Sequence, residues 1–580
     1  MADITAQIAN LNPFSKHSRK GNEDVGDTIE PGAVGNHFHI LDSAKATLPV
    51  SHALKAFIAK HEILPERDVG LGAEHHTEAL RSLLCKPHIH VPPIVTDRSY
   101  PLPDYFISSS HNTYLLAHQL FGESNASGYR TALTTGSRCV EIDAWDNPDN
   151  VQEPKVTHGY TLVSHIPFRA VCETIRDVYD EELEATFKTP GQEPSPILIS
   201  LENHCGPEGQ LRLVQIMNEV WGDRLLSKAI REGADPEHVT LKELRASIAV
   251  IVEFHFPDEV EHDDDDDEEE EEEDGVEITE EENKARQEYK QQKKTQPSTL
   301  IVPELGALGV YAQSVKPVNN SWFDSGELLN GPHHHLINVS ESGLKTHLPA
   351  NKVPISIHNS RHLMRVFPKG TRITSSNLKP VPFWGLGAQV CALNWQTYGT
   401  SNQLNDALFF GTDGFVLKPE ALRTGGSGNI ATGRKKRLRL HVAGASNVPL
   451  QEDNDGDDAI KPYLTCNLYH PDDLENEPPK RKTSAYRQHK LGFLHRGENP
   501  PPTDPIWDET LEWEYDDNEL VFLRLLIKSD DSWAVNPIVA ALAVRLSYVT
   551  PGWSFLRMMD LKGKESDCSV LVKFEFEDIE

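Results

Sequence analysis

The chain has 580 residues, a formal net charge of -33 and 7 cysteines. This length predicts two or three domains, and so acidic a balance argues against nucleic acid as a partner, because a phosphate polymer requires a basic surface. The odd number of scattered cysteines, without CxxC pairs, argues against a disulfide framework and a structural zinc site. No run of roughly 18 apolar residues occurs, so we expect no transmembrane span and a cytoplasmic protein.

The N-terminal part changes from a polar segment to a helical one. Residues 1–48 are rich in Gly, Asn, Asp and Ser, which predicts a disordered leader. In residues 49–97 the apolar side chains of Leu54, Phe57, Ile58 and Leu80 recur at helical spacing, which predicts short helices. A complete EF-hand loop is missing there, so we interpret this segment as an EF-hand remnant.

Two stretches of alternating strands and helices follow, and a highly acidic segment lies between them. Residues 98–256 contain short apolar runs that alternate with helical patterns, and the alternation resumes over residues 299–421. This order predicts an α/β fold with a parallel sheet, and we expect a TIM-type (β/α)8 barrel built from two halves. Residues 257–298 include the unbroken acidic run 263–274, which predicts a disordered linker. That linker is either a spacer or a regulatory element.

The C-terminal part has a different pattern. Residues 422–433 are rich in Gly and predict a flexible linker. In residues 434–580, short runs alternate between apolar and polar side chains, as in the run 438–442. Such strands over this length predict a β-sandwich.

Oxygen-bearing side chains stand at the ends of the predicted barrel strands. Glu141 and Asp143 are two residues apart, so on a strand they share one face, and Glu202 ends another apolar run. Asn112 follows a third run. Three buried carboxylates need a cation, and Arg138 is the only basic side chain close to them in sequence. A set of oxygen donors favours Ca²⁺, although a salt-bridged pair remains the alternative.

Two histidines accompany these acids without being needed as ligands. His111 precedes Asn112, and His158 follows the strand that carries Asp143. Imidazole titrates near neutral pH, so one ring can accept a proton while the other donates one to a leaving group. By itself a His-Asn pair is more often an ordinary surface pair, and only its neighbours favour a catalytic role.

The order of these motifs resembles eukaryotic phosphoinositide-specific phospholipase C. The similarity is greatest to a delta-like, fungal-type form without a pleckstrin-homology domain, and it covers residues 98–577, including the X half, the Y half and a C2 domain. It is carried by Ser-His-Asn at 110–112, Val-Glu-Ile-Asp-Ala-Trp-Asp at 140–146, His-Gly-Tyr-Thr at 158–161, Leu-Glu-Asn-His at 201–204, Leu-Asn-Trp-Gln-Thr at 393–397 and Gly-Phe-Val-Leu-Lys-Pro at 414–419.

The resemblance implies calcium-dependent hydrolysis of an inositol phospholipid to diacylglycerol and an inositol phosphate, through a 1,2-cyclic phosphate, in signal transduction. It assigns the Ca²⁺ ligands to Asn112, Glu141, Asp143 and Glu202. Glu141 also serves as the base for the inositol 2-hydroxyl. His111 stabilises the pentavalent phosphate, and His158 is the acid for the diacylglycerol oxygen.

The residues that recognise the inositol ring depart from the family pattern. Glu253 and His255 stand where the family has two lysines, Asn338 stands at a serine position, and Phe367 replaces a stacking tyrosine. Arg365 is retained. A carboxylate repels a phosphate, so we expect weak recognition of the 4- and 5-phosphates and a preference for phosphatidylinositol or its monophosphate, unless the alignment slips by a few residues.

The resemblance also implies an apolar rim that enters the bilayer. Leu120, Tyr160 and Leu162 match this rim. We therefore expect a monomer that acts peripherally on the cytoplasmic face of a membrane and binds phosphoinositide lipid there.

Two other functions compete with this hypothesis. A glycerophosphodiester phosphodiesterase also combines a barrel, paired acids, a metal and two histidines, but it would have His-Arg at 111–112 and would leave the second half-barrel and the sandwich unexplained. The other alternative is a catalytically weak or inactive scaffold or lipid-binding protein, which gains weight from Glu253 and His255.

Overall fold

The computed structural model describes residues 26–29, 42–73, 75–115, 124–157, 165–188, 194–231, 238–256, 300–316, 321–324, 328, 331–369, 376–450, 460–489, 499–530 and 538–579. The predictions for His158, Leu120, Tyr160 and Leu162, and for the acidic linker 257–298, lie outside these residues. In the described part of the chain no helix combines the length and the apolar character that a membrane crossing requires.

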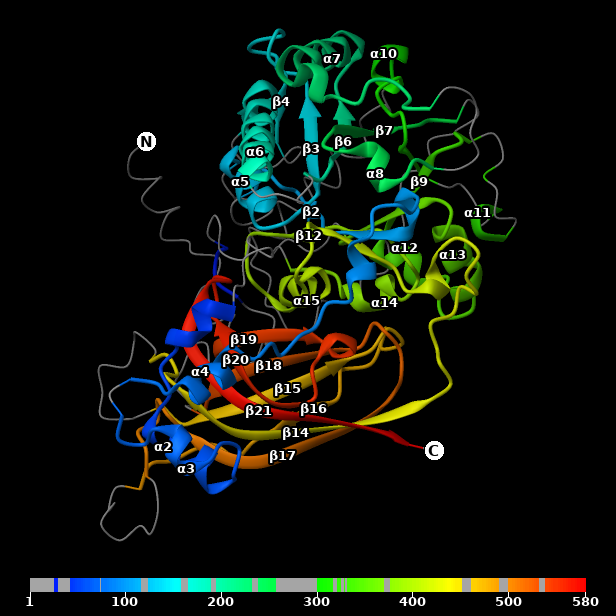
Figure 1. Cartoon of the computed structure of the whole chain (residues 1–580). Helices are drawn as coiled ribbons and strands as arrows, with labels where there is room; N and C mark the ends of the chain where they lie inside the picture. Colours follow the sequence, from blue (N-terminus) through cyan, green and yellow to red (C-terminus); the bar gives the residue numbers. More distant parts are fainter. Residues whose placement is uncertain are drawn as a thin grey trace, which may run out of the picture.

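The first large unit is a barrel of parallel strands surrounded by helices, shown in the upper part of Figure 1. Each strand pairs in parallel with its neighbour, and the parallel bridge between Ser109 and Cys139 closes the ring. The predicted TIM-type fold is therefore confirmed. In order around the ring the strands are β1 (Tyr105–Ile107), β3 (Cys139–Trp145), β6 (Ile197–His204), β7 (Ile248–Glu253), β8 (Gln313–Val315), β9 (His335–Ser340), β10 (Leu363–Phe367) and β11 (Val390–Cys391).

Side chains alternate between the inside of the barrel and the surrounding helices. On β7, Ala249 and Ile251 belong to the inner apolar cluster, whereas Val250 and Val252 belong to the layer that includes helix side chains. This period of two is what a strand requires when both of its faces are buried. The main helices of the outer layer are α5 (Ser127–Thr134), α6 (Phe168–Lys188), α7 (Pro207–Trp221), α13 (Lys352–Asn359) and α15 (Thr400–Phe409).

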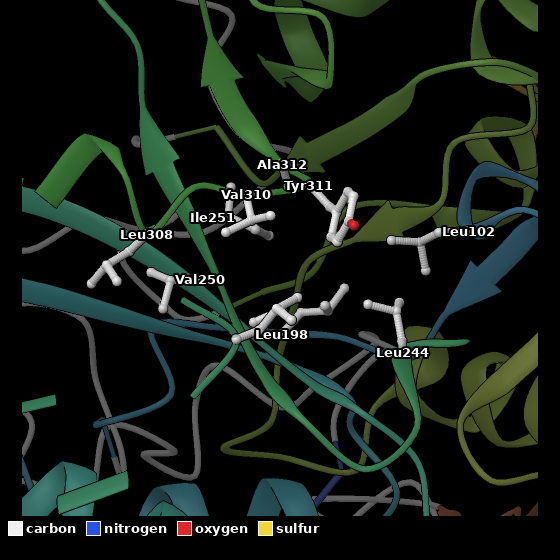
Figure 2. Close-up of a pocket in the computed structure, with 11 residues that line it drawn as sticks. Leu102, Leu198, Leu244, Val250, Ile251, Leu308, Val310, Tyr311 and Ala312 are labelled. Atoms are coloured by element: carbon white, nitrogen blue, oxygen red, sulfur yellow. The ribbon is translucent and has the colours of Figure 1, made fainter. Parts of the chain in front are cut away.

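A pocket at the amino-terminal ends of the barrel strands has an apolar lining. Figure 2 shows this pocket, into which Tyr311, Leu102 and Leu244 point from different segments. Leu198 and Ile251 add strand side chains to the same wall. This lining offers one phenol and otherwise hydrocarbon, so it provides no set of groups for acid-base chemistry. The three carboxylates described below lie toward the opposite, carboxyl ends of the strands.

The second large unit is an antiparallel β-sandwich, as predicted for the C-terminal part. Two four-stranded sheets, β16-β15-β18-β19 and β20-β21-β14-β17, are connected by the pairing of Ala541 with Met559. Apolar side chains of both sheets, such as Leu440 and Leu525, share one core. The strands are β14 (Lys435–Ser446), β15 (Pro462–Tyr469), β16 (Lys480–Lys482), β17 (Ile506–Asp516), β18 (Phe522–Ser529), β19 (Ile538–Arg545), β20 (Gly552–Met559) and β21 (Glu565–Ile579).

Short N-terminal helices cover part of the sandwich (Figure 1). They are α2 (His52–Lys60), α3 (Glu66–Val69) and α4 (Glu78–Cys85). Leu54, Ile58 and Leu84 pack with Phe555 and Leu571 of the sandwich in one buried cluster. Ser51 and Thr77 begin α2 and α4 by accepting backbone N–H groups of the first turn. This helical segment therefore contributes to the sandwich side of the molecule.

Part of the predicted disordered leader is ordered, which corrects the prediction for residues 1–48. The 3₁₀ helix η1 covers Asp42–Thr47. The segment 26–29 lies between the two large units: the backbone N–H of Asp27 donates to Leu561 O (2.8 Å), and its carbonyl accepts from the N–H of Tyr398 (3.0 Å). Ile29 is 7% exposed. Amino-acid composition could not predict that this segment is ordered, because the partners of these backbone groups are hundreds of residues away in sequence.

The barrel and the sandwich also contact each other directly. Arg524 of β18 is buried, and its Nε donates to Gln403 Oε1 of α15 (2.7 Å). The rings of Trp384 and Phe522 lie 5.7 Å apart across the same boundary. An interface with a buried guanidinium and packed aromatic rings holds the sandwich against one side of the barrel.

Candidate functional site

Three carboxylates meet at the carboxyl-terminal side of the barrel. Glu141 and Asp143 share one face of β3, and the parallel register places Asp143 beside Glu202 of β6. One carboxylate oxygen from each of the three lies within 4.8 Å of the others. The period of two on β3 and the alignment of two neighbouring parallel strands are enough to produce this cluster.

Asn112 joins this cluster from the turn after β2 (Ser110–His111). Its φ of 46° is in the left-handed region, which asparagine tolerates better than most residues. The Asn112 backbone N–H donates to Glu141 Oε2 (2.6 Å), and its Oδ1 lies 3.1 Å from the Tyr114 hydroxyl. That hydroxyl is also 2.5 Å from Asp143 Oδ2. Tyr114 therefore bridges two of the predicted metal ligands, a role that sequence reasoning missed.

A cation from the second half-barrel contacts the acids. Arg365 of β10 donates from Nη2 to Glu141 Oε1 and from Nη1 to Glu202 Oε1 (3.5 Å). Its side chain is almost fully buried. Arg138, which is the basic side chain close to the acids in sequence, makes a two-pronged ion pair with Glu182 on α6 instead. The partner of the acids was missed because β10 lies far from β3 in sequence and reaches it only across the barrel.

The electrostatics of the cluster favour an additional cation. Burial raises the pKa of the Asp143 carboxyl well above its usual value, and Glu202 and Glu141 raise it further. Burial, followed by repulsion from Glu141, also raises the pKa of Glu202. Asp143 Oδ1 is buried and has no hydrogen-bond partner. One guanidinium thus faces three carboxylates, and the hard oxygen donors suit a divalent ion such as Ca²⁺.

His111 lies beside the acids. Its Nδ1 is 2.9 Å from Asn394 Oδ1, and its Nε2 is 4.0 Å from Glu141 Oε2. Burial, together with the charge of Arg365, lowers the pKa of His111 to about 4. Asn394 was not singled out from the sequence, although it stands in the Leu-Asn-Trp-Gln-Thr motif. The position of His158 relative to this ring lies outside the described residues.

The predicted substrate-binding residues lie on strands of both halves. Asn338 of β9 is in register with Arg365 of β10, and Asn338 Oδ1 accepts from Arg365 Nη1 (3.1 Å). Phe367 ends β10 with its ring 5.5 Å from the Arg365 guanidinium carbon. Glu253 ends β7, and His255 follows two residues later. These residues therefore come from the strand ends on the side where the acids cluster.

Comparison with known protein families gives two matches along the barrel. Residues 98–253 match the model described as phosphatidylinositol-specific phospholipase C, X domain, and residues 305–421 match the corresponding Y domain. The two matches contain all described residues of the acid cluster together with His111, Asn338 and Arg365.

Curated relatives match over most of this chain but only part of their own length. A 1-phosphatidylinositol 4,5-bisphosphate phosphodiesterase 1 from Candida albicans is 28% identical over 88% of this chain and 51% of the relative. The bovine 1-phosphatidylinositol 4,5-bisphosphate phosphodiesterase delta-4 is 31% identical over 81% of this chain and 61% of the relative. The human delta-1 phosphodiesterase is 28% identical over 84% of this chain and 61% of the relative. The chain thus spans about half to three fifths of these relatives.

A solved structure supports the fold. The crystal structure of L. pealei PLC21 aligns with a TM-score of 0.68 and 22% sequence identity, covering 99% of this chain and 69% of that chain. The S. officinalis PLC21 structure gives a TM-score of 0.67 at the same identity. At this identity the likeness establishes the arrangement of barrel and sandwich.

Proposed function

This chain belongs to the phosphatidylinositol-specific phospholipase C family through its X and Y domains, and from that premise we propose that it is a calcium-dependent phosphoinositide phospholipase C. It hydrolyses an inositol phospholipid to diacylglycerol and an inositol phosphate through a 1,2-cyclic phosphate. The observation that carries this proposal is the cluster of Glu141, Asp143 and Glu202 beside His111, with a buried Asp143 oxygen that lacks a hydrogen-bond partner.

The metal proposed for this cluster is Ca²⁺, which Asn112, Glu141, Asp143 and Glu202 would hold. Side-chain oxygens are the ligands that Ca²⁺ takes, and the raised pKa values of Asp143 and Glu202 mark a shortage of positive charge. A bound Ca²⁺ supplies Lewis-acid polarisation, which lowers the pKa of the inositol 2-hydroxyl.

The side chains divide the proton transfers between them. Glu141 accepts the proton of the inositol 2-hydroxyl, whose oxygen then attacks phosphorus. The bond from phosphorus to the diacylglycerol oxygen breaks, and that oxygen takes a proton from His158. His111 stabilises the charge on the pentavalent phosphate. Water then opens the cyclic phosphate to the inositol phosphate.

Substrate choice rests on Arg365, Asn338, Phe367 and His255, with Glu253 opposing phosphate. The names of the relatives give phosphatidylinositol 4,5-bisphosphate as their substrate. In this chain Glu253 ends β7 at the position expected to carry a lysine, so phosphatidylinositol or its monophosphate is the preferred lipid. Hydrolysis of the three lipids in mixed micelles tests this preference, and a strong preference for the bisphosphate contradicts it. Glu253→Lys should shift the preference toward the bisphosphate.

The activity itself is tested with labelled phosphatidylinositol in mixed micelles, titrated with CaCl₂. Wild-type protein should require calcium, and His158→Ala and Glu141→Gln should each lose most of the turnover. A folded wild-type protein that binds vesicles but hydrolyses none of the three lipids would instead support the scaffold or lipid-binding alternative, which Glu253 and His255 favour.

The cellular setting proposed here is a peripheral monomer on the cytoplasmic face of a membrane. We propose Leu120, Tyr160 and Leu162 as the apolar residues that enter the bilayer. Co-sedimentation with phosphoinositide vesicles should fall when these three are replaced by serine, whereas activity on monomeric short-chain lipid should be retained. Light scattering on the eluting protein checks the monomer.

A further inference from the structure

The imidazole of His111 is oriented by one amide side chain. Asn394 lies on β12 (Leu393–Asn394), which pairs in parallel with β2 so that Asn394 stands directly beside His111. Its Oδ1 is 2.9 Å from His111 Nδ1. Asn394 is 1% exposed, so this hydrogen bond is shielded from competing water.

The orientation of the Asn394 amide is determined by its other neighbours. Its Nδ2 donates to Ser376 O (3.1 Å). Reversing the amide would place Oδ1 against that carbonyl oxygen, bringing two acceptors together. The Asn394 backbone is held as well, because Asn377 accepts its N–H through Oδ1 (2.6 Å) and donates to its carbonyl through Nδ2 (3.0 Å). Oδ1 is therefore the atom that faces His111.

An amide oxygen can only accept, so His111 Nδ1 must carry the hydrogen. The other ring nitrogen, Nε2, then faces the acid cluster, 4.0 Å from Glu141 Oε2. Rotation of the ring by a half turn would break the hydrogen bond to Asn394 and point Nε2 away from the acids.

We propose that Asn394 is a positioning residue that keeps the hydrogen on His111 Nδ1 and directs Nε2 toward the reacting phosphate. This inference rests on the proposed phospholipase function for its consequence in catalysis, but the hydrogen-bond arrangement exists without it. Asn394 acts through His111 and does not itself touch the lipid. Nδ1 donates to Asn394 whether or not Nε2 carries a proton, so a proton that the ring takes up from solvent when the anionic phosphate binds goes to Nε2, which then donates to that phosphate.

Two substitutions of Asn394 separate the effect of its hydrogen-bond acceptor from the effect of its side-chain shape. Asn394→Leu removes the acceptor at similar volume, whereas Asn394→Asp keeps an oxygen facing Nδ1. We expect Asn394→Leu to lower kcat by about 10- to 100-fold with KM changed by less than about twofold, since ring orientation matters in the transition state. Asn394→Asp should recover most of that loss.

A matched control distinguishes positioning from general stability. Asn359 is also a fully buried barrel asparagine, but its Nδ2 donates to Leu386 O far from His111. Asn359→Leu should lower the melting temperature while kcat per folded molecule stays at the wild-type value. Equal losses of kcat in Asn359→Leu and Asn394→Leu would overturn the proposal.

The state of the ring is read directly by NMR of ¹⁵N-histidine-labelled protein, with His111 assigned by comparison with His111→Gln. Wild-type protein at pH 7.5 should show hydrogen on Nδ1 and a bare Nε2, and Asn394→Leu should show a mixture of the two neutral forms. A wild-type ring with its hydrogen on Nε2 refutes the inference. This measurement needs no turnover, so a wild type that hydrolyses no lipid refutes the proposed function without affecting this inference.

Discussion

Arg365 on β10 donates to the carboxylate of Glu141 on β3, so the second half-barrel neutralises an acid of the first. Both side chains are 2% exposed. The pair ties the two halves together at the point where the acids would bind Ca²⁺. A buried ion pair is sensitive to the loss of either partner, because the remaining charge stays buried without compensation.

Arg365→Met should therefore destabilise the calcium-free protein by about 3–5 kcal/mol, since three carboxylates lose their common cation. Saturating CaCl₂ should recover much of this loss, because Ca²⁺ provides the missing positive charge. Thermal unfolding in EGTA and in CaCl₂ measures both values.

The control for this prediction is Arg138→Met, which removes another buried guanidinium whose partner is Glu182. Its loss of stability should be the same with and without calcium. If Arg365→Met and Arg138→Met respond to calcium alike, Arg365 does not neutralise the acids of the proposed calcium site.

Asp143→Asn should stabilise the calcium-free protein and weaken its stabilisation by calcium. Burial and two neighbouring carboxylates raise the pKa of Asp143, so its ionisation becomes less favourable on folding and stability is lost as the pH rises above its unfolded pKa. A neutral amide removes that cost. Calcium affinity should fall at least about tenfold, because the site loses one charged ligand. Calorimetric titration with CaCl₂ at pH 7.5 provides the check, and an unchanged affinity rules out Asp143 as a ligand.

A histidine cluster at the other end of the barrel should make the protein sensitive to acid. His335 Nε2 lies 2.9 Å from His358 Nε2, and the ring of His362 stacks on His335 at 3.9 Å. Burial lowers the pKa values of His335 and His358 to about 4 and about 3. Below the unfolded pKa of about 6.5 the unfolded chain binds more protons, so stability falls as the pH decreases toward 4.

Replacing His358 with Gln should reduce this dependence by up to about 1.4 kcal/mol per pH unit between pH 6 and 5. Urea unfolding at pH 7.5, 6 and 5, with calcium held saturating, gives the difference from wild type. His165→Gln, at an exposed position, serves as the control and should leave the slope unchanged. An identical slope in wild type and His358→Gln would mean that this ring is not buried in its neutral form.

The segment 26–29 should contribute measurably to stability. Ile29 is buried between the two units, whereas its neighbour Thr28 is exposed. Ile29→Asp should cost at least about 2 kcal/mol, because it loses the burial of an isoleucine and places a charge there. Thr28→Asp should have little effect. Thermal unfolding and limited proteolysis compare the two, and equal behaviour would show that the segment is not docked in solution.

Part of the site was predictable because it depends on local pattern. The spacing of Glu141 and Asp143 on an apolar run indicates a shared face, and Glu202 follows the same rule on the next parallel strand. The apolar runs also indicate the barrel strands, since strands buried on both faces need hydrocarbon at successive positions. These features depend on residues within one strand or on strands that are consecutive in the parallel order.

The sequence by itself determined the α/β barrel, the β-sandwich and the residue types of an acid cluster that could bind a metal, because periodicity and short motifs are recorded locally in the chain. Only the tertiary structure decided that Arg365 faces Glu141, that Asn394 orients His111 and that Ile29 is buried between the two units. Each of these contacts joins residues more than 200 positions apart. Closure of the barrel and packing of the sandwich against it bring these residues together. A local sequence pattern does not specify which distant side chain will make each contact.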